Sequence, residues 1–414
     1  MGGPPLGDTS QVSFEQQDPP FCYMQGHYEE LWGFAPHPSK LEFCTGAEDE
    51  TLRVWDLERR QMRAMAKIEG PVSTMRLTHH APYTPGALAL RRPSVANSSR
   101  TNSLSPLVPP ACQVRCCTYS PDGQWIAVGL GSGGKAKCPV PPKCEGKWIV
   151  LESEDLELKY APPQIRHERC SDLKFSPDGK FIAVGNADNF IDLYTVPGHY
   201  AKDQQEFKRV GQFRGHSSFI LHIDWYTHPA PAPPRALPLH HPAHRPCSTP
   251  LLTAPTTPPP PPLRSRDSQY LQSNCGAHEL LYWRVWDTSP DGERLVLRPR
   301  QEKTSSAMRD MQWNSQSTLF GWHMRGIWPE DADGTDVNAC CRSNTGKREL
   351  LCTADDFGKV KLFRYPCIVP RADHRPYGGH SSHVTNLGFT YNDHWLISAG
   401  GDDRAVFQWQ VSKE

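Results

Sequence analysis

One short motif in this sequence contains residue types that bind phosphate groups in other proteins. Residues 129–135 have the glycine and lysine spacing of a phosphate-binding loop, and they follow the apolar run 126–128. Such a loop needs a serine or threonine after its lysine and a helix behind it. Ala136 and the proline-rich residues after it supply neither. We therefore predict a hairpin loop at this point, with no nucleotide and no other cofactor.

Two groups of residues contain cysteine and histidine, the residue types that ligate zinc in other proteins. They are Cys138 with Cys144, and His240, His241 and His244 with Cys247. Neither group has the paired short spacings of a structural zinc site. No Ser-His-Asp, Cys-His or paired-carboxylate arrangement stands apart from the repeats described below. The sequence therefore predicts no metal site, no catalytic residue and no small-molecule substrate.

Other histidines recur at a fixed distance from a tryptophan. His27 lies 28 residues before Trp55, and His380 lies 29 residues before Trp409. In each case the tryptophan ends a segment rich in strand-forming residues. Agreement over so long an interval indicates an internal repeat of about forty residues.

Turn sequences between the two ends of the chain continue this pattern. The tetrapeptide Ser-Pro-Asp-Gly occurs at 120–123 and again at 176–179, each time between two alternating apolar runs. Proline presets φ for a turn and glycine tolerates positive φ, so both sites predict β-hairpins. Further units end at Trp283 and Phe363, which are 80 residues apart, or about two periods. A degenerate unit is therefore expected around 311–328.

Six clear units and one degenerate unit predict an all-β fold, a WD40-type β-propeller with seven blades. Because little chain remains after Trp409, we expect an N-terminal strand near residues 11–14 to close the ring. The predicted organisation is an N-terminal segment at 1–22 that holds the closing strand, blades at 23–226, and a proline-rich disordered insert at 227–266. The remaining blades occupy 267–414.

A second insert interrupts the first group of blades. This serine-rich segment, at about 80–111, contains Ser94, Ser103 and Ser105. We expect these serines to be phosphorylation sites, because a loop of this composition is open to kinases and each phosphate adds roughly 1.5 to 2 negative charges. The alternative is an inert linker.

The repeated residues predict a buried hydrogen-bond network in each blade. In a WD repeat, a histidine, a strand hydroxyl group, a turn aspartate and the tryptophan bond to one another, and a fully paired network fixes one conformation. We assign this structural role to His27, Thr45, Asp49, Trp55, Asp188, Tyr194, His216, Trp283, His380, Asp403 and Trp409.

Two units depart from the network pattern. Ala277 stands at the aspartate position of the unit that ends at Trp283, where His278 is a candidate replacement. In the last unit Ala399 stands at the hydroxyl position, so that network is incomplete unless Ser398 substitutes.

Charge and hydropathy narrow the classes of partner. Lysine plus arginine equals aspartate plus glutamate at 45 each, so there is no strong field to hold nucleic acid or an anionic membrane. No apolar run reaches the roughly 18 to 20 residues that span a bilayer, and the polar N-terminus has no secretory signal. We predict a cytoplasmic protein without nucleic-acid or membrane partners.

Several segments resemble one family closely, the echinoderm microtubule-associated protein-like WD-repeat proteins. They are 215–220, 268–274, 326–330 followed by 333–336, 354–360 and 379–386. The resemblance covers most of residues 23–412. Members of this family have an N-terminal coiled coil and two tandem propellers that bind tubulin or microtubules. The resemblance implies that this chain corresponds to the second propeller, and we expect it to be the C-terminal part of such a protein.

The expected function is therefore that of a non-catalytic interaction platform. Propellers present many short loops on a rigid ring, which suits protein recognition. The resemblance implies tubulin and microtubules as partners, and a place on the microtubule cytoskeleton. The alternative is a general WD-repeat scaffold or adaptor in a signalling or ubiquitin-ligase complex without microtubule contact.

Overall fold

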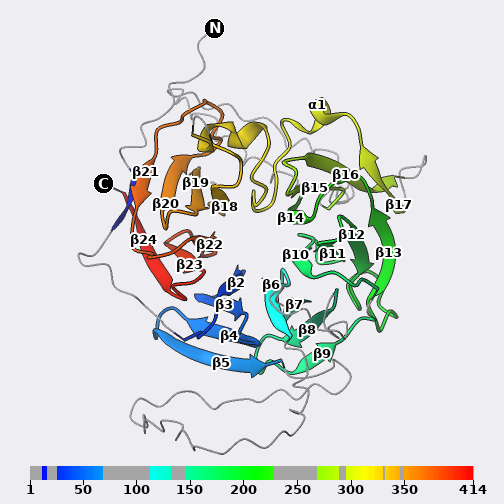
Figure 1. Cartoon of the computed structure of the whole chain (residues 1–414). Helices are drawn as coiled ribbons and strands as arrows, with labels where there is room; N and C mark the ends of the chain where they lie inside the picture. Colours follow the sequence, from blue (N-terminus) through cyan, green and yellow to red (C-terminus); the bar gives the residue numbers. More distant parts are fainter. Residues whose placement is uncertain are drawn as a thin grey trace, which may run out of the picture.

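Short antiparallel β-strands make up nearly all of the regular structure in this chain. A computed structural model describes residues 12–15, 26–68, 112–131, 146–163, 165–227, 268–288, 295–329, 332–345 and 349–413. Within these ranges the strands form six four-stranded sheets, which stand as blades around a central channel (Figure 1). The predicted all-β propeller is confirmed. The inserts predicted at 80–111 and 227–266 lie outside the described residues, apart from Thr227.

Within each blade, neighbouring strands are hydrogen-bonded in the following order. The blades are β2 (Leu31–Pro36), β3 (Glu42–Ala47), β4 (Thr51–Asp56) and β5 (Gln61–Lys67); β6 (Gln113–Tyr119), β7 (Trp125–Gly131), β8 (Trp148–Glu152) and β9 (Leu158–Tyr160); β10 (Cys170–Phe175), β11 (Phe181–Asn186), β12 (Ile191–Thr195) and β13 (Lys208–Phe213); β14 (Ile220–Trp225), β15 (Tyr270–Cys275), β16 (Leu280–Thr288) and β17 (Leu295–Glu302); β18 (Val337–Arg342), β19 (Leu350–Asp355), β20 (Val360–Arg364) and β21 (Arg375–Tyr377); and β22 (Val384–Phe389), β23 (Trp395–Gly400), β24 (Val406–Lys413) and β1 (Val12–Glu15).

The two Ser-Pro-Asp-Gly sequences form the hairpin turns that the sequence predicts. In the first, the Gly123 N–H donates to the Ser120 carbonyl at 2.8 Å, and Gly123 has a φ of +74°. The Ser120 hydroxyl accepts the Trp125 N–H at 2.9 Å, which holds the next strand in register. The second turn repeats this arrangement, since the Phe181 N–H donates to the Ser176 hydroxyl, also at 2.9 Å.

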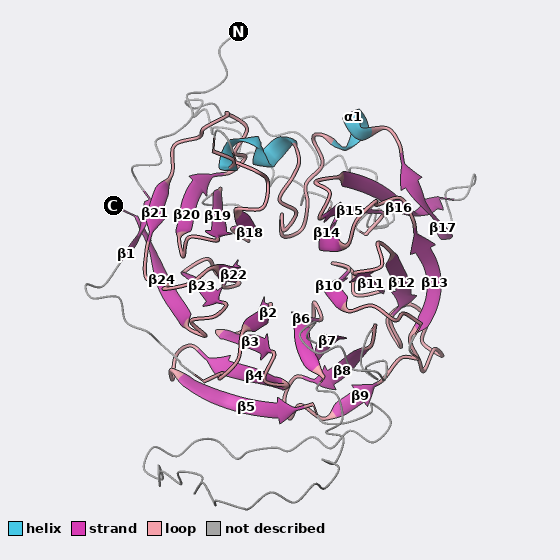
Figure 2. Cartoon of the chain, viewed as in Figure 1, coloured by secondary structure: helices cyan, strands magenta, loops and turns pink. Residues whose placement is uncertain are grey.

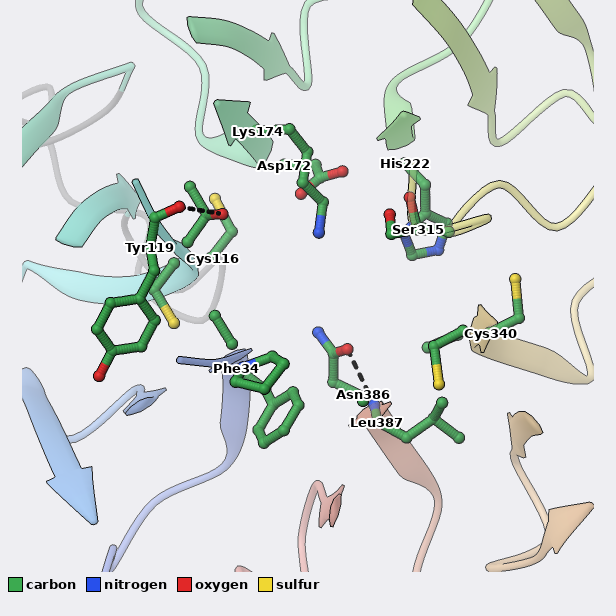
Figure 3. A pocket seen from close by; sticks show the side chains of 18 of the residues that line it. Phe34, Cys116, Tyr119, Asp172, Lys174, His222, Ser315, Cys340, Asn386 and Leu387 are labelled. Carbon is green, nitrogen blue, oxygen red and sulfur yellow. Dashed lines mark hydrogen bonds between the residues drawn. The ribbon is translucent and has the colours of Figure 1, made fainter. Parts of the chain in front are cut away.

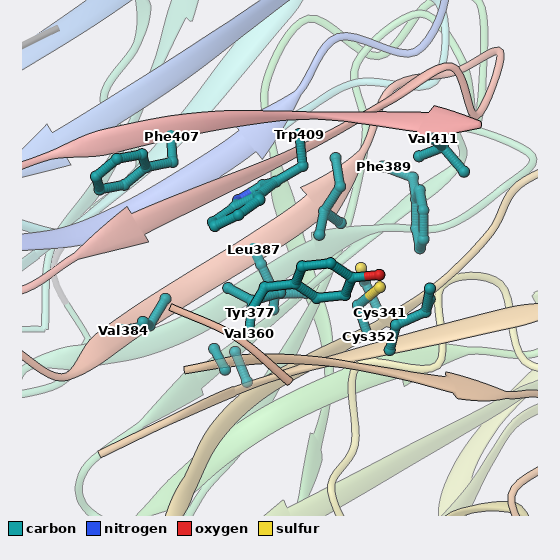
Figure 4. Packing of buried hydrophobic residues seen from close by; sticks show 14 of the residues in the cluster. Cys341, Cys352, Val360, Tyr377, Val384, Leu387, Phe389, Phe407, Trp409 and Val411 are labelled. Atoms are coloured by element: carbon teal, nitrogen blue, oxygen red, sulfur yellow. The ribbon is translucent and has the colours of Figure 1, made fainter. Parts of the chain in front are cut away.

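The hydrophobic core lies between neighbouring blades. Figure 4 shows one such layer, in which Tyr377 at the outer edge of one blade faces Trp409 and Phe389 of the next. Their exposed fractions are 9%, 3% and 2%, respectively. Burial of a large apolar side chain contributes roughly 1.5–3 kcal/mol. Each sheet is therefore held by what packs against its two faces and has little core of its own.

An N-terminal strand completes the last blade. Strand β1 pairs antiparallel with β24, with Val12 opposite Lys413 and Glu15 opposite Gln410. The blade formed by β22, β23 and β24 thus takes its outer strand from the opposite end of the chain, as Figure 1 shows.

Deletion of residues 1–20 is expected to lower the melting temperature of the protein by several degrees. The deletion removes β1 and leaves the ladder groups of β24 unpaired at an exposed edge. Deletion of residues 1–10 keeps β1 and is the matched control. Thermal unfolding followed by circular dichroism compares the two, and equal melting temperatures would show that β1 does not stabilise the ring.

The prediction of a seventh blade around 311–328 is wrong for the residues that the structure describes. The 3₁₀ helix η3 (Trp322–Ile327) lies in this stretch and helix α1 (Ser305–Met308) just before it, both between the sheet that ends at β17 and the sheet that begins at β18 (Figure 2). The chain before η3 fills the sector instead. The Ser317 hydroxyl donates to the Ile223 carbonyl of β14 at 2.9 Å, and the Arg342 N–H of β18 donates to the Ser315 carbonyl at 3.0 Å.

The aromatic residues of this stretch explain why the repeat spacing predicted a blade here. Trp313 stacks on Tyr282 at 5.8 Å between ring centroids, and Phe320 stacks on Trp328 at 5.3 Å. Trp313 is buried and the other three rings are partly buried, by side-to-side packing of an irregular chain with no alternation between the two faces of a strand. The interval of 80 residues between Trp283 and Phe363 is therefore long enough for an additional blade, but the chain within it does not form one.

Helices play almost no part in the fold. In the described portion of the chain, no helix has the length and apolar character needed to cross a membrane.

Candidate functional site

One face of the ring collects the loops that lead into the first strand of each blade. In five of the six blades, the turn between the second and third strands folds against this loop through a backbone N–H to carbonyl hydrogen bond of 2.9–3.0 Å; the turn between β7 and β8 lies mostly outside the described residues. Examples are Glu48 to Glu30, Gly276 to Phe219, and Gly401 to His383. We call the face formed by these loops and turns the histidine face, because His27, His216 and His380 lie in the loops. The opposite face carries the turns at 120–123 and 176–179.

The first strand of every blade contains a β-bulge near the histidine face. The residue pairing shifts in β2, β6, β10, β14, β18 and β22, and the unpaired residues are Trp32, Arg115, Ser171, Leu221, Asn338 and Thr385. All six line the central channel. A bulge strengthens local twist and turns a side chain out of the sheet. The innermost strands thereby bring one extra side chain per blade to the channel wall.

The channel encloses a cavity of about 950 Å³. In Figure 3 the side chains of Lys174 and Asn386 extend toward its centre from opposite sides. Asp172 lies on the same strand as Lys174, and Cys116 and Cys340 lie on other inner strands. The wall therefore contains acidic, basic and thiol groups, all of which are capable of chemistry.

Hydrogen bonds give Asp172 a structural role. Its Oδ2 accepts the Ile223 N–H of the neighbouring blade at 2.8 Å, and its Oδ1 accepts the Leu173 N–H at 2.9 Å. Burial raises the pKa of Asp172, although Lys174 and the two N–H donors oppose the shift. The carboxyl group ties β10 to β14, and it is not arranged as a general acid or base.

His222 has a similar role on the next inner strand. Its Nε2 lies 2.9 Å from the Asn338 carbonyl, to which it donates, and it links β14 to β18 across the irregular sector. Burial lowers the pKa of His222 to about 4. The imidazole ring is therefore neutral at physiological pH.

The first blade contains a continuous side-chain network beneath the histidine face. His27 Nδ1 lies 2.9 Å from Asp49 Oδ2, and its Nε2 lies 2.8 Å from the Thr45 hydroxyl. The Trp55 Nε1–H donates to that hydroxyl at 2.7 Å. Asp49 also accepts hydrogen bonds from Thr51 and Arg53. Burial acts to raise the pKa of Asp49, but the bonds from His27 and Thr51 and the charge of Arg53 outweigh it and lower this pKa.

The last blade repeats the network with a serine in place of the threonine. His380 Nδ1 lies 2.9 Å from Asp403 Oδ2, and Nε2 lies 2.8 Å from the Ser398 hydroxyl. The Trp409 Nε1–H donates to Ser398 at 2.9 Å. Ser398 thus fills the position that Ala399 leaves empty.

The blade of Asp188 and Tyr194 is organised around an arginine. The Arg166 guanidinium contacts Asp188 at 3.2 Å and Asp192 at 2.7 Å. Tyr194 is not part of this ion-pair cluster and packs edge-on against Trp148, at 5.1 Å between ring centroids. Asp188 therefore joins an ion-pair cluster, whereas Tyr194 belongs to the core between two blades. Arg166 was not predicted, because the sequence pattern relies on a histidine in the loop before the blade.

The blade of His216 and Trp283 lacks the aspartate. His216 Nε2 lies 2.7 Å from the Ser273 hydroxyl, to which the Trp283 Nε1–H also donates at 2.7 Å. His278 does not replace the aspartate, because its ring packs against Phe320 at 5.3 Å. Glu279 comes nearest, with Oε2 3.4 Å from His216 Nδ1.

Some sequence predictions fall on residues that the structure does not describe. These are the phosphorylation sites Ser94, Ser103 and Ser105, the cysteines Cys138 and Cys144, and the group formed by His240, His241, His244 and Cys247. Of the glycine-rich stretch 129–135, only Gly129 to Gly131 are described, at the end of strand β7.

The histidine face also exposes large apolar side chains that the sequence reasoning missed. Phe357 is 69% exposed and Tyr28 is 57% exposed, while Phe219 and Trp32 are exposed by 38% and 36%. The Arg115 guanidinium lies over the Trp32 ring, 5.5 Å from its centroid. Tyr28 and Phe219 follow shortly after a Gly-His pair, which was the available signal in the sequence.

Comparisons with known proteins identify the same repeat and one family. Residues 264–411 match the family described as "Echinoderm microtubule-associated protein second beta-propeller". Residues 19–56, 105–138 and 164–195 match "WD domain, G-beta repeat". These matches confirm the resemblance drawn from the sequence.

Curated relatives agree with the family match. Echinoderm microtubule-associated protein-like 2 of Mus musculus is 32% identical over 389 residues, covering 94% of this chain and 43% of the relative. Echinoderm microtubule-associated protein-like 3 of Homo sapiens is 31% identical over 388 residues, covering 94% and 31%. Echinoderm microtubule-associated protein-like 1 of Mus musculus is 33% identical over 387 residues, covering 94% and 34%. The chain thus spans less than half the length of these relatives.

Proposed function

Because this chain belongs to the echinoderm microtubule-associated protein-like WD-repeat family, we propose that it is a cytoplasmic, non-catalytic platform that binds tubulin or microtubules through its histidine face. The names of the relatives support microtubule association, and Asp172 and His222 of the channel wall are engaged in holding blades together. The names give no support to the alternative of a signalling or ubiquitin-ligase adaptor.

The exposed aromatic side chains of the histidine face are the observation that carries this proposal. Aromatic residues are enriched in the centres of protein interfaces, where a few of them contribute most of the binding energy. Tyr28 and Phe357 stand on the blades to either side of the last blade. Arg404 of that blade donates to the Tyr28 carbonyl at 2.9 Å. Gly358, which follows Phe357, lies so close to the same blade that an added Cβ would be 2.7 Å from the His380 carbonyl oxygen. The two aromatic rings therefore belong to one continuous surface.

Several charged groups on this surface lie beside groups of opposite sign. The Arg115 guanidinium lies 3.1 Å from Glu48, and His383 Nε2 lies 2.9 Å from Glu30. Such pairs leave no strong field of one sign. Binding is therefore expected to depend on apolar contact and to change little with salt, in contrast to binding by a basic linker.

A co-sedimentation assay with purified chain and polymerised tubulin tests the proposal. The double variant Tyr28→Ala, Phe357→Ala is expected to bind at least about tenfold more weakly, because loss of an interface hot spot costs roughly 2 kcal/mol or more. Both side chains are more than half exposed, so the variant is expected to fold.

The control is Tyr391→Ala with Tyr200→Ala. These side chains are 40% and 41% exposed and lie outside the histidine face, so their removal should leave microtubule binding unchanged. If the wild-type chain does not co-sediment, the proposed partner is wrong. If both double variants bind like the wild type, the partner stands but the histidine face is the wrong surface.

A further inference from the structure

The blade of His216 has a polar gap where the intact blades have an aspartate. His216 Nδ1 is buried and makes no hydrogen bond of normal geometry, its nearest polar neighbour being Glu279 Oε2 at 3.4 Å, although His27 and His380 each use the same atom to bind an aspartate. The His216 side chain is 1% exposed. An orphaned buried nitrogen costs about 1–3 kcal/mol and calls for an explanation such as a missing ion.

Two further groups with metal affinity surround this nitrogen. The Cys275 thiol and the Glu279 carboxylate lie beside it, and the three ligand atoms are all within 4.8 Å of one another. Cys275 ends strand β15, Glu279 precedes β16, and His216 comes from the loop before β14. The site thus joins a turn to the neighbouring loop of the histidine face.

We propose that His216 Nδ1, Cys275 Sγ and Glu279 bind a zinc ion, which takes the place of the absent aspartate. Imidazole, thiolate and carboxylate together are ligands that zinc accepts, whereas calcium and magnesium require oxygen ligands alone. The thiolate and the carboxylate carry two negative charges, which balance the charge of the ion. Binding releases the thiol proton of Cys275 to solvent.

Two of the three distances between the ligand atoms already suit tetrahedral coordination. Glu279 Oε2 lies 3.4 Å from His216 Nδ1 and 3.3 Å from Cys275 Sγ. In a tetrahedron with zinc bonds of about 2.0 Å to nitrogen or oxygen and about 2.3 Å to sulfur, the edges are roughly 3.3–3.5 Å. Two edges of the site are therefore near the required length before any ion is bound.

The surroundings also orient the histidine for this role. Coordination through Nδ1 requires the proton on Nε2, and that atom lies 2.7 Å from the Ser273 hydroxyl, which can accept it. A metal-bound histidine almost always donates its other N–H in this way. The Glu279 carboxylate is also held, since its Oε2 accepts the Ser217 N–H at 2.8 Å.

One coordination position remains for a ligand from solvent. The Glu279 side chain is 35% exposed, so the ion would lie just below the surface. Phe219 is next to it, because the Gly276 N–H donates to the Phe219 carbonyl at 3.0 Å. Three protein ligands with an open fourth position allow a water molecule or a partner's side chain to complete the site.

Cobalt titration of the purified, metal-free chain tests this inference independently of microtubule binding. Co²⁺ should produce visible bands of tetrahedral geometry and a near-ultraviolet thiolate-to-cobalt band, and one equivalent of Zn²⁺ should abolish both. Cys275→Ser should lose the thiolate band. Glu279→Gln should weaken Co²⁺ binding by about 100-fold or more, because even the outer partners of metal ligands are worth 10- to 100-fold.

Asp402→Asn is the matched control. Asp402 is an exposed carboxylate in the corresponding turn of the last blade, and its variant should bind Co²⁺ like the wild type. The zinc site would be overturned if the wild type gave no thiolate band, or if that band persisted in Cys275→Ser. Undiminished Co²⁺ affinity in Glu279→Gln, a change of similar shape at a partly exposed position, would equally overturn it.

Discussion

Replacement of Asp49 by alanine is expected to lower the free energy of unfolding by about 3–5 kcal/mol. The carboxylate is 4% exposed and binds His27 at 2.9 Å, the Thr51 hydroxyl at 2.6 Å and Arg53 at 3.4 Å. Its loss removes the carboxylate acceptor shared by a buried guanidinium and a buried imidazole. Denaturant unfolding of the variant and the wild type at pH 7.5 measures the difference.

The control for this substitution is Asp402→Ala in the last blade. Asp402 is an exposed turn residue, and such substitutions usually change stability by less than about 0.5 kcal/mol. A loss below about 1 kcal/mol for Asp49→Ala would mean that the network in the first blade contributes little to stability.

Acidification from pH 7.5 to pH 5.0 is expected to destabilise the fold by about 4 kcal/mol through two histidines alone. Burial lowers the pKa of His222 to about 4 and, with Lys40 nearby, lowers that of His37 to about 4. Above pH 6.5 both histidines are neutral in the folded and unfolded states. Below it only the unfolded chain takes up their protons, and at pH 5.0 this costs about 2 kcal/mol per histidine.

The variant His222→Gln isolates one of these contributions. Glutamine keeps a side-chain N–H for the Asn338 carbonyl but does not titrate. The difference in unfolding free energy between the two pH values should therefore shrink by about 2 kcal/mol. His374→Gln, at an exposed position, should leave that difference unchanged. An unaltered difference in His222→Gln would show that His222 does not resist protonation.

The hydrogen-bond network of the first blade could be read from the sequence because its geometry is encoded in residue spacing. Successive strands of a blade pair in register, so Thr45 and Trp55 meet once the lengths of the two hairpin strands are known. Ser398 shows the limit of this reasoning. It is offset by one residue from the expected hydroxyl position, yet it reaches both His380 and Trp409.

Residues that take the place of the network histidine or aspartate from a different position in the chain could not be predicted from spacing. Arg166 is longer than histidine and reaches two carboxylates from its own loop. Glu279 approaches His216 from two residues beyond Ala277, while His278, which has a φ of +62°, is directed to Phe320 instead. Exposure of Tyr28 and Phe357 likewise depends on how neighbouring blades pack.

The measurement that most directly tests the central claim is amide hydrogen exchange of this chain with and without microtubules. A ring that binds through its histidine face should show slower exchange at 28–32, 215–219, 276–278 and 356–358 in the complex. Exchange at 120–124, 176–180 and 390–394, on the opposite face, should remain unchanged. Protection confined to the opposite face, or exchange unaltered throughout the histidine face of the bound chain, would contradict the account.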